Sequence, residues 1–437
     1  MKIMKQAFIL MTSATLLLSC DMGKESNAIT SDTISVADTS KDLPEPYATE
    51  SAKKFSKALG WRDGQKPIAP AGFIVEKFAD QLENPRWLYV LPNGDVLVAE
   101  AGTKGAIKSV AAFVSGNSKT RLSSGSADRI TLFRDTNKDG IPDVRNVFLD
   151  GLNQPLGMVL VDNMFYVANT DGVVAFPYTK GQTSISASGK KITDLPANGY
   201  NNHWTRNIIT NKDGSQLYVT VGSSSNVAEH GIEDEVMRAN VLVMNLDGSD
   251  KKVFASGLRN PVGLAFDVDS KKLWTVVNER DGLGDELVPD YLTSVQEGGF
   301  YGWPYSYWGQ HLDPRMNGAG KELVEKAIVP EVSLGSHTAS LGLAFYNHTA
   351  FPNQYHNGAF IGQHGSWNRT TFSGYKVVFV PFKNGKPNGE PQDFLTGFIA
   401  NVDEVYGRPV GIVVLPDGSI LVADDSANTI WRVRVDR

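Results

Sequence analysis

The turns that open apolar, strand-like runs carry three arginines, Arg206, Arg259 and Arg408, and a fourth, Arg369, comes from a strand that follows such a run. A guanidinium group binds carboxylates and phosphates through paired hydrogen bonds, so arginines gathered in one cleft indicate an anionic ligand. The inference is sharper because the chain as a whole is acidic, with a formal net charge of −6. Any one of these arginines could instead pair with an acidic side chain such as Asp424 or Asp425 and join two strands.

His203 is the leading candidate for proton chemistry. It stands where an apolar run begins, between Asn202 and Trp204. Imidazole titrates near neutral pH, where a general base is useful. A single histidine is more often a structural hydrogen-bonding group, and His337 and His364 are the rival candidates.

The loop at residues 278–286 carries a different chemistry. It offers the acidic side chains of Asp281, Asp285 and Glu286, together with backbone carbonyls around Gly282 and Gly284. Oxygen ligands on a turning backbone suit Ca²⁺. We therefore expect a calcium site in this loop.

A second calcium signal lies at residues 135–143. Oxygen-bearing side chains occupy the first, third, fifth and ninth positions of a calcium loop, and they belong to Asp135, Asn137, Asp139 and Asp143. Gly140 stands at the sixth position, but Asn146 replaces the glutamate expected at the twelfth. The pattern predicts a structural calcium turn, and a plain acidic turn is the alternative.

These residues belong to a sequence that repeats one unit six times. Each copy has a turn, an apolar run, a hairpin and a second apolar run, and the copies open near residues 84, 153, 203, 259, 340 and 408. No copy can bury both faces alone, so the repeat predicts an all-β protein, a six-bladed β-propeller over residues 66–437. The first strand of each copy would line a central channel, with its opening turns converging at one mouth. Residues 73–78 would close the ring beside the C-terminal blade.

Composition supports this fold and narrows the partners. The 437 residues are 41% hydrophobic and include 42 Gly and 21 Pro, which suits an all-β chain with many turns. The acidic balance argues against nucleic acid as a partner, because phosphate backbones require a basic surface. The single cysteine, Cys20, excludes an intrachain disulfide and a thiolate metal cluster.

The N-terminus predicts export. Lys2 and Lys5 precede an apolar run at residues 7–18 that is short for a membrane span, and the run ends in a lipobox-like sequence before Cys20. We expect a signal peptide over residues 1–20 and lipidation of Cys20, with an uncleaved anchor as the alternative. Polar residues 21–65, with little apolar pattern until Phe55 and Trp61, predict a mostly disordered tether. The protein would then be a bacterial lipoprotein on the periplasmic side of a membrane or at the cell surface, held to the membrane only by lipid.

Five motifs in this order resemble those of one enzyme family. They are LNQPLG at 152–157, NHWTRN at 202–207, GLRNP at 257–261, GGFYGWP at 298–304 and GRPV at 407–410. Over residues 70–437 the chain resembles the quinoprotein sugar dehydrogenases: soluble glucose and aldose dehydrogenases and, more closely, the sorbosone dehydrogenase group. The resemblance implies a six-bladed propeller that binds pyrroloquinoline quinone (PQQ), a planar tricarboxylate, together with Ca²⁺ at the mouth.

The resemblance also implies residue roles. His203 would remove the sugar hydroxyl proton, and Arg259 would lie near the reactive quinone carbonyl. With the converging turns, it predicts a cofactor-binding set: Gln154, Arg206, Asn260, Arg369 and Arg408. Backbone carbonyls at Arg280 and Asp281 would hold the cofactor calcium, whereas Asp285 and Glu286 would hold a second, structural calcium.

The expected function is PQQ- and Ca²⁺-dependent oxidation of an aldose, a sorbosone-like aldehyde or a polyol. Hydride would pass to the quinone, and the electrons would leave to a quinone or cytochrome. Two alternatives differ in their sites. A propeller lactone hydrolase needs carboxylates and asparagines around one exposed metal, and a non-catalytic carbohydrate- or protein-binding propeller would have an empty mouth.

Overall fold

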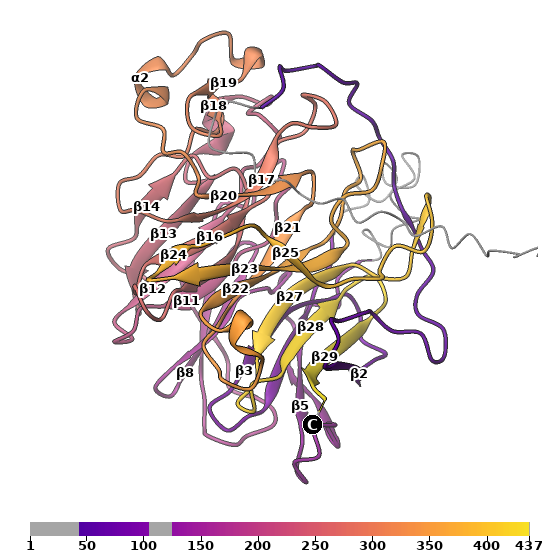
Figure 1. Cartoon of the computed structure of the whole chain (residues 1–437). Coiled ribbons are helices and arrows are strands. Elements are labelled where there is room, and N and C mark those ends of the chain that lie inside the picture. The colour runs from indigo at the N-terminus through magenta and orange to yellow at the C-terminus, as the bar shows by residue number, and fades with distance from the viewer. Residues whose placement is uncertain (1–42, 105–124, 437) are drawn as a thin grey trace, which may run out of the picture. The chain divides into compact units, whose positions relative to one another are not determined.

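The computed structural model describes residues 43–104 and 125–436, and within them the chain forms six antiparallel sheets of four or five strands (Figure 1). Four sheets follow the chain in simple meanders. The first three are β3–β6 (Pro85–Val90, Val96–Glu100, Arg129–Arg134, Val144–Leu149), β7–β10 (Met158–Val161, Met164–Asn169, Gly172–Pro177, Lys190–Asp194) and β11–β14 (Ile208–Thr210, Gln216–Val221, Asn240–Asn245, Lys252–Ser256). The fourth consists of β15, β16, β17 and β20 (Pro261–Phe266, Leu273–Val277, Pro289–Ser294, Val332–Ser336).

The last two sheets complete the ring. The fifth contains β21 to β25 (Ser340–Tyr346, Gly358–Gln363, Lys376–Lys383, Lys386–Pro387, Gln392–Leu395). The sixth contains β27, β28, β29 and β2 (Pro409–Val414, Ile420–Asp424, Thr429–Val435, Phe73–Ala79). Because β2 pairs with β29, the N-terminal strand closes the ring beside the C-terminal blade, as residues 73–78 predicted.

The inner strands of neighbouring blades contact one another around the whole ring, in the order β3, β7, β11, β15, β21, β27 and back to β3. The predicted six-bladed propeller is therefore confirmed. The glycine that recurs in the inner strands explains how they approach so closely. A Cβ atom on Gly342 would lie 2.0 Å from the main-chain oxygen of Val410, and one on Gly157 would lie 2.3 Å from the main-chain nitrogen of Ile208. Neither position can accept a side chain without displacing backbone.

Apolar clusters fill the spaces between the blades. One cluster joins Trp274 and Leu292 of the fourth blade to Leu343 and Ile361 of the fifth, and all four are nearly or fully buried. Each sheet thus buries both faces, which stabilises units that could not fold alone. Within the described part of the chain, no helix has the length and apolar character needed to cross a bilayer.

The remaining short elements lie in the segments that connect the strands. The largest insertion lies inside the fourth blade, between β17 and β20, and carries β18 (Ser306–Tyr307), β19 (His311–Leu312), the 3-10 helix η3 (Pro314–Met316) and α2 (Lys321–Val324). Two further 3-10 helices are η2 (Ile232–Glu235) and η4 (Asn353–Tyr355).

The boundary predicted at residue 65 needs correction. Residues 43–65 pack against the propeller: β1 (Lys57–Ala58) pairs in parallel with β26 (Glu404–Val405), and the Phe55 ring stacks on Trp367. The sequence lacks apolar periodicity here because this segment gains its contacts from distant loops and forms no sheet of its own. Residues 21–42 of the predicted tether, and Cys20, lie outside the described residues.

Candidate active site

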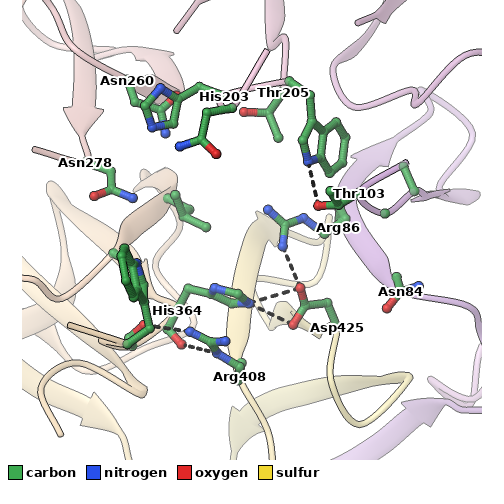
Figure 2. Close-up of a pocket in the computed structure, with 18 of the residues that line it drawn as sticks. Asn84, Arg86, Thr103, His203, Thr205, Asn260, Asn278, His364, Arg408 and Asp425 are labelled. Atoms are coloured by element: carbon green, nitrogen blue, oxygen red, sulfur yellow. Dashed lines mark hydrogen bonds and ion pairs between the residues drawn. The ribbon is translucent and has the colours of Figure 1, made fainter. Parts of the chain in front are cut away.

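A cavity of about 220 Å³ opens where the inner strands begin. Its wall takes residues from the segments that precede or open the inner strands of every blade but the second, and they are Asn84, Arg86, Asn202, His203, Trp204, Thr205, Asn260, His337, Ala339, Leu341 and Arg408. The ends of other strands add Asn278, Asp281, His364, Trp367, Asn368 and Asp425. Figure 2 shows His203 and Asn260 on one side of this cavity and His364, Arg408 and Asp425 on the other. The convergence of turns that the repeat predicted is present.

The Nδ1 atom of His203 contacts Ser223. It lies 2.9 Å from the main-chain oxygen of Ser223 and 3.0 Å from the hydroxyl of the same residue. The Ser223 hydroxyl in turn donates to the Ser225 main-chain oxygen at 2.6 Å. A carbonyl oxygen can only accept, so the Nδ1 atom carries the proton in the neutral ring and Nε2 carries the lone pair. This tautomer suits a base that acts through Nε2.

Arg408 combines burial with an unused donor. Its side chain is nearly fully buried, with Nε donating to the main-chain oxygen of His364 at 2.9 Å and Nη2 to that of Gly365 at 2.6 Å. Its main-chain nitrogen donates to Asp424 Oδ1 at 2.8 Å. Nη1 is buried and has no hydrogen-bond partner among the described residues. A buried cationic donor without a partner is costly, so this atom is suited to an anionic ligand atom.

Arg86 is a second arginine in the wall that the sequence interpretation missed. Its Nη1 atom donates to Asp425 Oδ2 at 2.5 Å, and its guanidinium lies over the Trp204 ring. Its buried Nε atom has no partner among the described residues. The sequence repeat could have predicted this position, because Arg86 opens the first copy just as Arg408 opens the sixth.

Asp425 links Arg86 to His364. His364 Nε2 lies 2.9 Å from Asp425 Oδ1 and 3.0 Å from Oδ2. Burial, with Arg408 nearby, lowers the pKa of His364 to about 4, so this ring is neutral at pH 7 and donates from Nε2. Burial alone would raise the pKa of Asp425, but His364 and Arg86 outweigh it and hold that pKa well below its usual range. The far wall thus carries an ionised carboxylate whose charge is balanced by Arg86.

The other three predicted arginines do not line the cavity, so the predicted cluster of four requires correction. Arg206 is fully buried and donates to the main-chain oxygens of Pro196, His203 and Thr205. Burial, together with nearby Arg238, lowers the pKa of Arg206 to about 9. Its two Nη atoms donate to these carbonyls and so brace the turn that carries His203, whereas its buried Nε atom has no partner among the described residues.

Arg259 and Arg369 also find protein partners. Arg259 donates to the main-chain oxygens of Asn226, Asn278 and Glu279 and lies 3.5 Å from Asp281 Oδ2. Burial lowers the pKa of Arg259. Arg369 is paired with Glu286. Arg259 therefore supports the wall residues Asn278 and Asp281 from behind, and Arg369 joins two loops.

Gln154 likewise lies behind the wall. Its side-chain amide donates to the main-chain oxygen of Gly102 at 2.8 Å, and its main-chain nitrogen donates to Asp128. Gly102 lines the cavity, but Gln154 does not. Asn260 does line it, and its buried Oδ1 atom has no hydrogen-bond partner among the described residues.

The loop at 278–286 presents a side chain to the cavity where a carbonyl was predicted. The main-chain oxygen of Asp281 accepts from Asn226 Nδ2 at 3.0 Å and Arg315 Nη1 at 2.7 Å, which uses both of its lone pairs. The Asp281 side chain lines the cavity and accepts from Asn368 Nδ2. The Arg280 guanidinium is fully buried in ion pairs with Glu279 and Asp313. The Asp281 carbonyl is therefore not available to a cation.

The predicted second calcium pair lies outside the cavity wall. Asp285 Oδ2 accepts the main-chain N–H of Thr370 at 2.9 Å, and its buried Oδ1 has no partner among the described residues. Glu286 is occupied by Arg369. One carboxylate oxygen thus remains for a cation, and the second calcium at Asp285 and Glu286 stays a prediction.

The predicted calcium turn at 135–143 joins β5 to β6, at the opposite end of the blade from the cavity. Its acidic side chains bind the turn's own backbone: Asp135 accepts from the N–H groups of Lys138 and Gly140, and Asp139 from that of Ile141. Asn137 accepts from Asp139, and Asp143 from Thr136. This bonding alone holds the turn, and calcium binding there stays a prediction.

Fold and cavity together define a β-propeller protein with a cavity lined by polar side chains at one mouth. Residues 107–430 match the model of the family described as Domain of unknown function (DUF7133), and the chain belongs to that family. An uncharacterized protein of Borreliella burgdorferi is 29% identical over 380 residues, covering 84% of this chain and 90% of that protein. Aldose sugar dehydrogenase YliI of Escherichia coli is 33% identical over 174 residues, which cover 39% of this chain and 43% of that protein.

Solved structures share the fold. The holo form of the pyranose dehydrogenase PQQ domain from Coprinopsis cinerea has a TM-score of 0.66 at 20% identity, covering 87% of this chain and all (100%) of that one. The PQQ-bound aldose sugar dehydrogenase of Streptomyces coelicolor has a TM-score of 0.54 at 17% identity, covering 84% and 100%. The resemblance to PQQ-dependent sugar dehydrogenases that the motifs predicted is confirmed, whereas membership of the sorbosone group stays a prediction.

Proposed function

We propose that this protein is a PQQ-dependent sugar dehydrogenase. The observation that carries the proposal is the Nη1 atom of Arg408, a buried cationic donor in the wall of the propeller mouth with no protein partner among the described residues. Arg86 adds a second such donor in the same wall. PQQ is a planar tricarboxylate, and its carboxylates are the kind of acceptor that these guanidinium atoms require.

A hard cation also has donors in the wall. The Asp281 carboxylate and the partnerless Oδ1 atom of Asn260 are oxygen ligands of the kind that Ca²⁺ prefers. We therefore assign Ca²⁺ to the Asp281 side of the cavity and the PQQ carboxylates to the Arg86 and Arg408 side. In this assignment the side chain of Asp281 takes the role that the resemblance gave to a backbone carbonyl.

His203 is the general base of the proposed reaction. When bound, PQQ would supply the acceptor for the hydride that leaves the sugar carbon. His203 lines the cavity, and its Nδ1–H group is held by Ser223, so its Nε2 lone pair can accept the proton of the sugar hydroxyl. Arg206 fixes the His203 main-chain oxygen at 2.6 Å and so limits the movement of the base.

The substrate is a small sugar, and we propose an aldose, a sorbosone-like aldehyde or a polyol. The two reducing equivalents would pass to a quinone or a cytochrome. We further propose that Cys20 is lipidated and that the enzyme works on the periplasmic side of a membrane or at the cell surface. That part rests on the N-terminal sequence, where a basic start and an apolar run precede Cys20.

Reconstitution tests the function. Purified apo-protein would receive PQQ and Ca²⁺, and reduction of a redox dye would be followed with a panel of aldoses, sugar aldehydes and polyols. We expect dye reduction only when protein, PQQ and sugar are all present. Lactone hydrolysis without PQQ would instead support the hydrolase, and sugar binding without either reaction would support the non-catalytic propeller.

A further inference from the structure

A segment ahead of the first blade contacts the loops around the cavity. We call residues 47–61 the mouth strap. At its start, the main-chain N–H of Tyr47 donates to the main-chain oxygen of Leu283 at 2.8 Å. The N–H groups of Gly284 and Asp285 donate to the hydroxyls of Ser51 and Thr49, at 3.0 and 2.8 Å. The strap therefore holds the loop that follows Asp281.

The middle of the strap holds a ring of the cavity wall. The main-chain N–H of Lys54 donates to the main-chain oxygen of Trp367 at 2.7 Å. The Phe55 ring stacks on the Trp367 ring with centroids 5.4 Å apart and planes 5° apart. Trp367 lines the cavity, so Phe55 fixes the orientation of a planar group in its wall.

The end of the strap reaches Arg408 through one carboxylate. The Trp61 indole N–H donates to Asp424 Oδ2 at 2.8 Å, and Asp424 Oδ1 accepts the main-chain N–H of Arg408, also at 2.8 Å. Burial raises the pKa of Asp424 to about 6, so each N–H that it receives matters for keeping it ionised near neutral pH. Trp61 also packs against Phe398 and Trp431.

The strap is not needed to close the ring. β2 lies after the strap in the chain, and it alone completes the sixth blade by pairing with β29. The strap's contacts instead gather on segments that flank the cavity, at residues 283–285, 367–370 and 403–406 and at Asp424. In Figure 1 the strap is the indigo segment that precedes β2.

We propose that the mouth strap is a positioning element of the ligand site, with Phe55 setting the Trp367 ring and Trp61 setting Arg408 through Asp424. This inference rests on the proposed function for the identity of the ligand, PQQ. Neither Phe55 nor Trp61 lines the cavity. They act through residues that do, as supporting partners do around many binding sites.

Trp61→Phe is the sharpest test because it keeps a six-membered aromatic ring and removes only the pyrrole ring with its N–H. In the otherwise intact protein, PQQ affinity would be measured by calorimetry at fixed Ca²⁺, well below the melting temperature. Hydrogen exchange of a peptide covering residues 406–410 would be measured without PQQ. We expect the Kd for PQQ to rise about tenfold, as for other supporting residues, and exchange at Arg408 to quicken.

Trp274→Phe is the matched control. Trp274 is fully buried in the fourth blade, whereas Trp61 is partly buried, and the Trp274 indole nitrogen has no hydrogen-bond partner among the described residues. This variant should lose thermal stability but keep the parent Kd and the parent exchange at 406–410. A second variant, Phe55→Leu, leaves the Trp61 contact intact and should quicken exchange at residues 366–368.

The proposal would be overturned if Trp61→Phe kept both the Kd and the hydrogen exchange of the parent protein. It would also be overturned if both strap variants, Trp61→Phe and Phe55→Leu, kept the exchange of the parent. If the parent protein fails to bind PQQ, the proposed function falls. The exchange measurements would still decide whether the strap positions the Arg408 and Trp367 segments, because they need no ligand. If Trp61→Phe does not fold, Phe55→Leu decides.

Discussion

The Nδ1 atom of His203 lies 2.9 Å from the main-chain oxygen of Ser223, which follows strand β12 and Gly222 in the chain. This contact sets the tautomer of the imidazole. It relies on close packing: a Cβ atom on Gly222 would lie 2.6 Å from His203 Cβ and 2.4 Å from Asn260 Oδ1. Two cavity residues from neighbouring blades thus pack on a glycine that cannot be enlarged.

His203→Gln should therefore lose turnover and keep the cofactor. We expect kcat to fall by about 10²–10⁴, the usual contribution of a positioned base. PQQ affinity should stay close to that of the parent, because the proposed site places the PQQ carboxylates against Arg86 and Arg408 on the other side of the cavity. The ascending limb of the pH–rate profile should also disappear. Steady-state kinetics and calorimetry check this, and near-parent turnover would move the role to His337 or His364.

Arg408→Ala should weaken PQQ binding by about 1.5–3 kcal/mol, the range for a hydrogen bond to a charged group. The loss follows because Nη1 is the buried donor that the protein leaves without a partner among the described residues. Calorimetry on apo-protein measures it. Arg145→Ala is a suitable control, since that guanidinium donates to the main-chain oxygens of Asp80 and Gln81. An unchanged affinity in Arg408→Ala would remove Arg408 from the site.

The His364–Asp425 pair should make stability depend on pH. The folded-state pKa of His364, about 4, lies below the ordinary value of 6.5, so its contribution is complete above pH 6.5 and is lost as the pH falls through 4. Each unit of pKa difference corresponds to about 1.4 kcal/mol. The charged groups that face this ring are Asp425, Arg86 and Arg408.

Urea unfolding at pH 7.5 and pH 5 checks this prediction. The parent should lose more stability than His364→Gln between the two values, because glutamine does not titrate. Asp424 acts in the opposite direction: its pKa of about 6 lies above the ordinary 3.8, so its contribution is lost as the pH rises. Equal pH dependence in parent and variant would show that folding does not shift the pKa of His364.

Cys20→Ala should release the protein from the membrane or leave the precursor uncleaved. The prediction follows from the sequence before Cys20, which resembles a lipobox. Membrane fractionation with mass spectrometry of the N-terminus measures both outcomes. A variant that fractionates and matures like the parent would contradict lipidation.

The sequence by itself determined the architecture and the location of the site. Alternating apolar runs with hairpin turns can bury both faces only by stacking in a ring, and the repeated glycine permits the inner strands to meet. A residue that opens an inner strand must then lie near the mouth. The positions of His203, Asn260 and Arg408 within the repeat are therefore sufficient to place them at the cavity.

Only the tertiary structure decided which guanidinium groups face the cavity. A long side chain bends toward whichever partner the fold brings near, and those partners are distant in sequence. Arg206 and Arg259 found main-chain oxygens, whereas Arg86 reached Asp425, 339 residues away. Trp61 reached Asp424, 363 residues away, so a segment without any periodic pattern became part of the fold. The local pattern of apolar and polar residues indicates which strand faces are buried. Pairing between side chains depends instead on loops that meet only after the ring has closed.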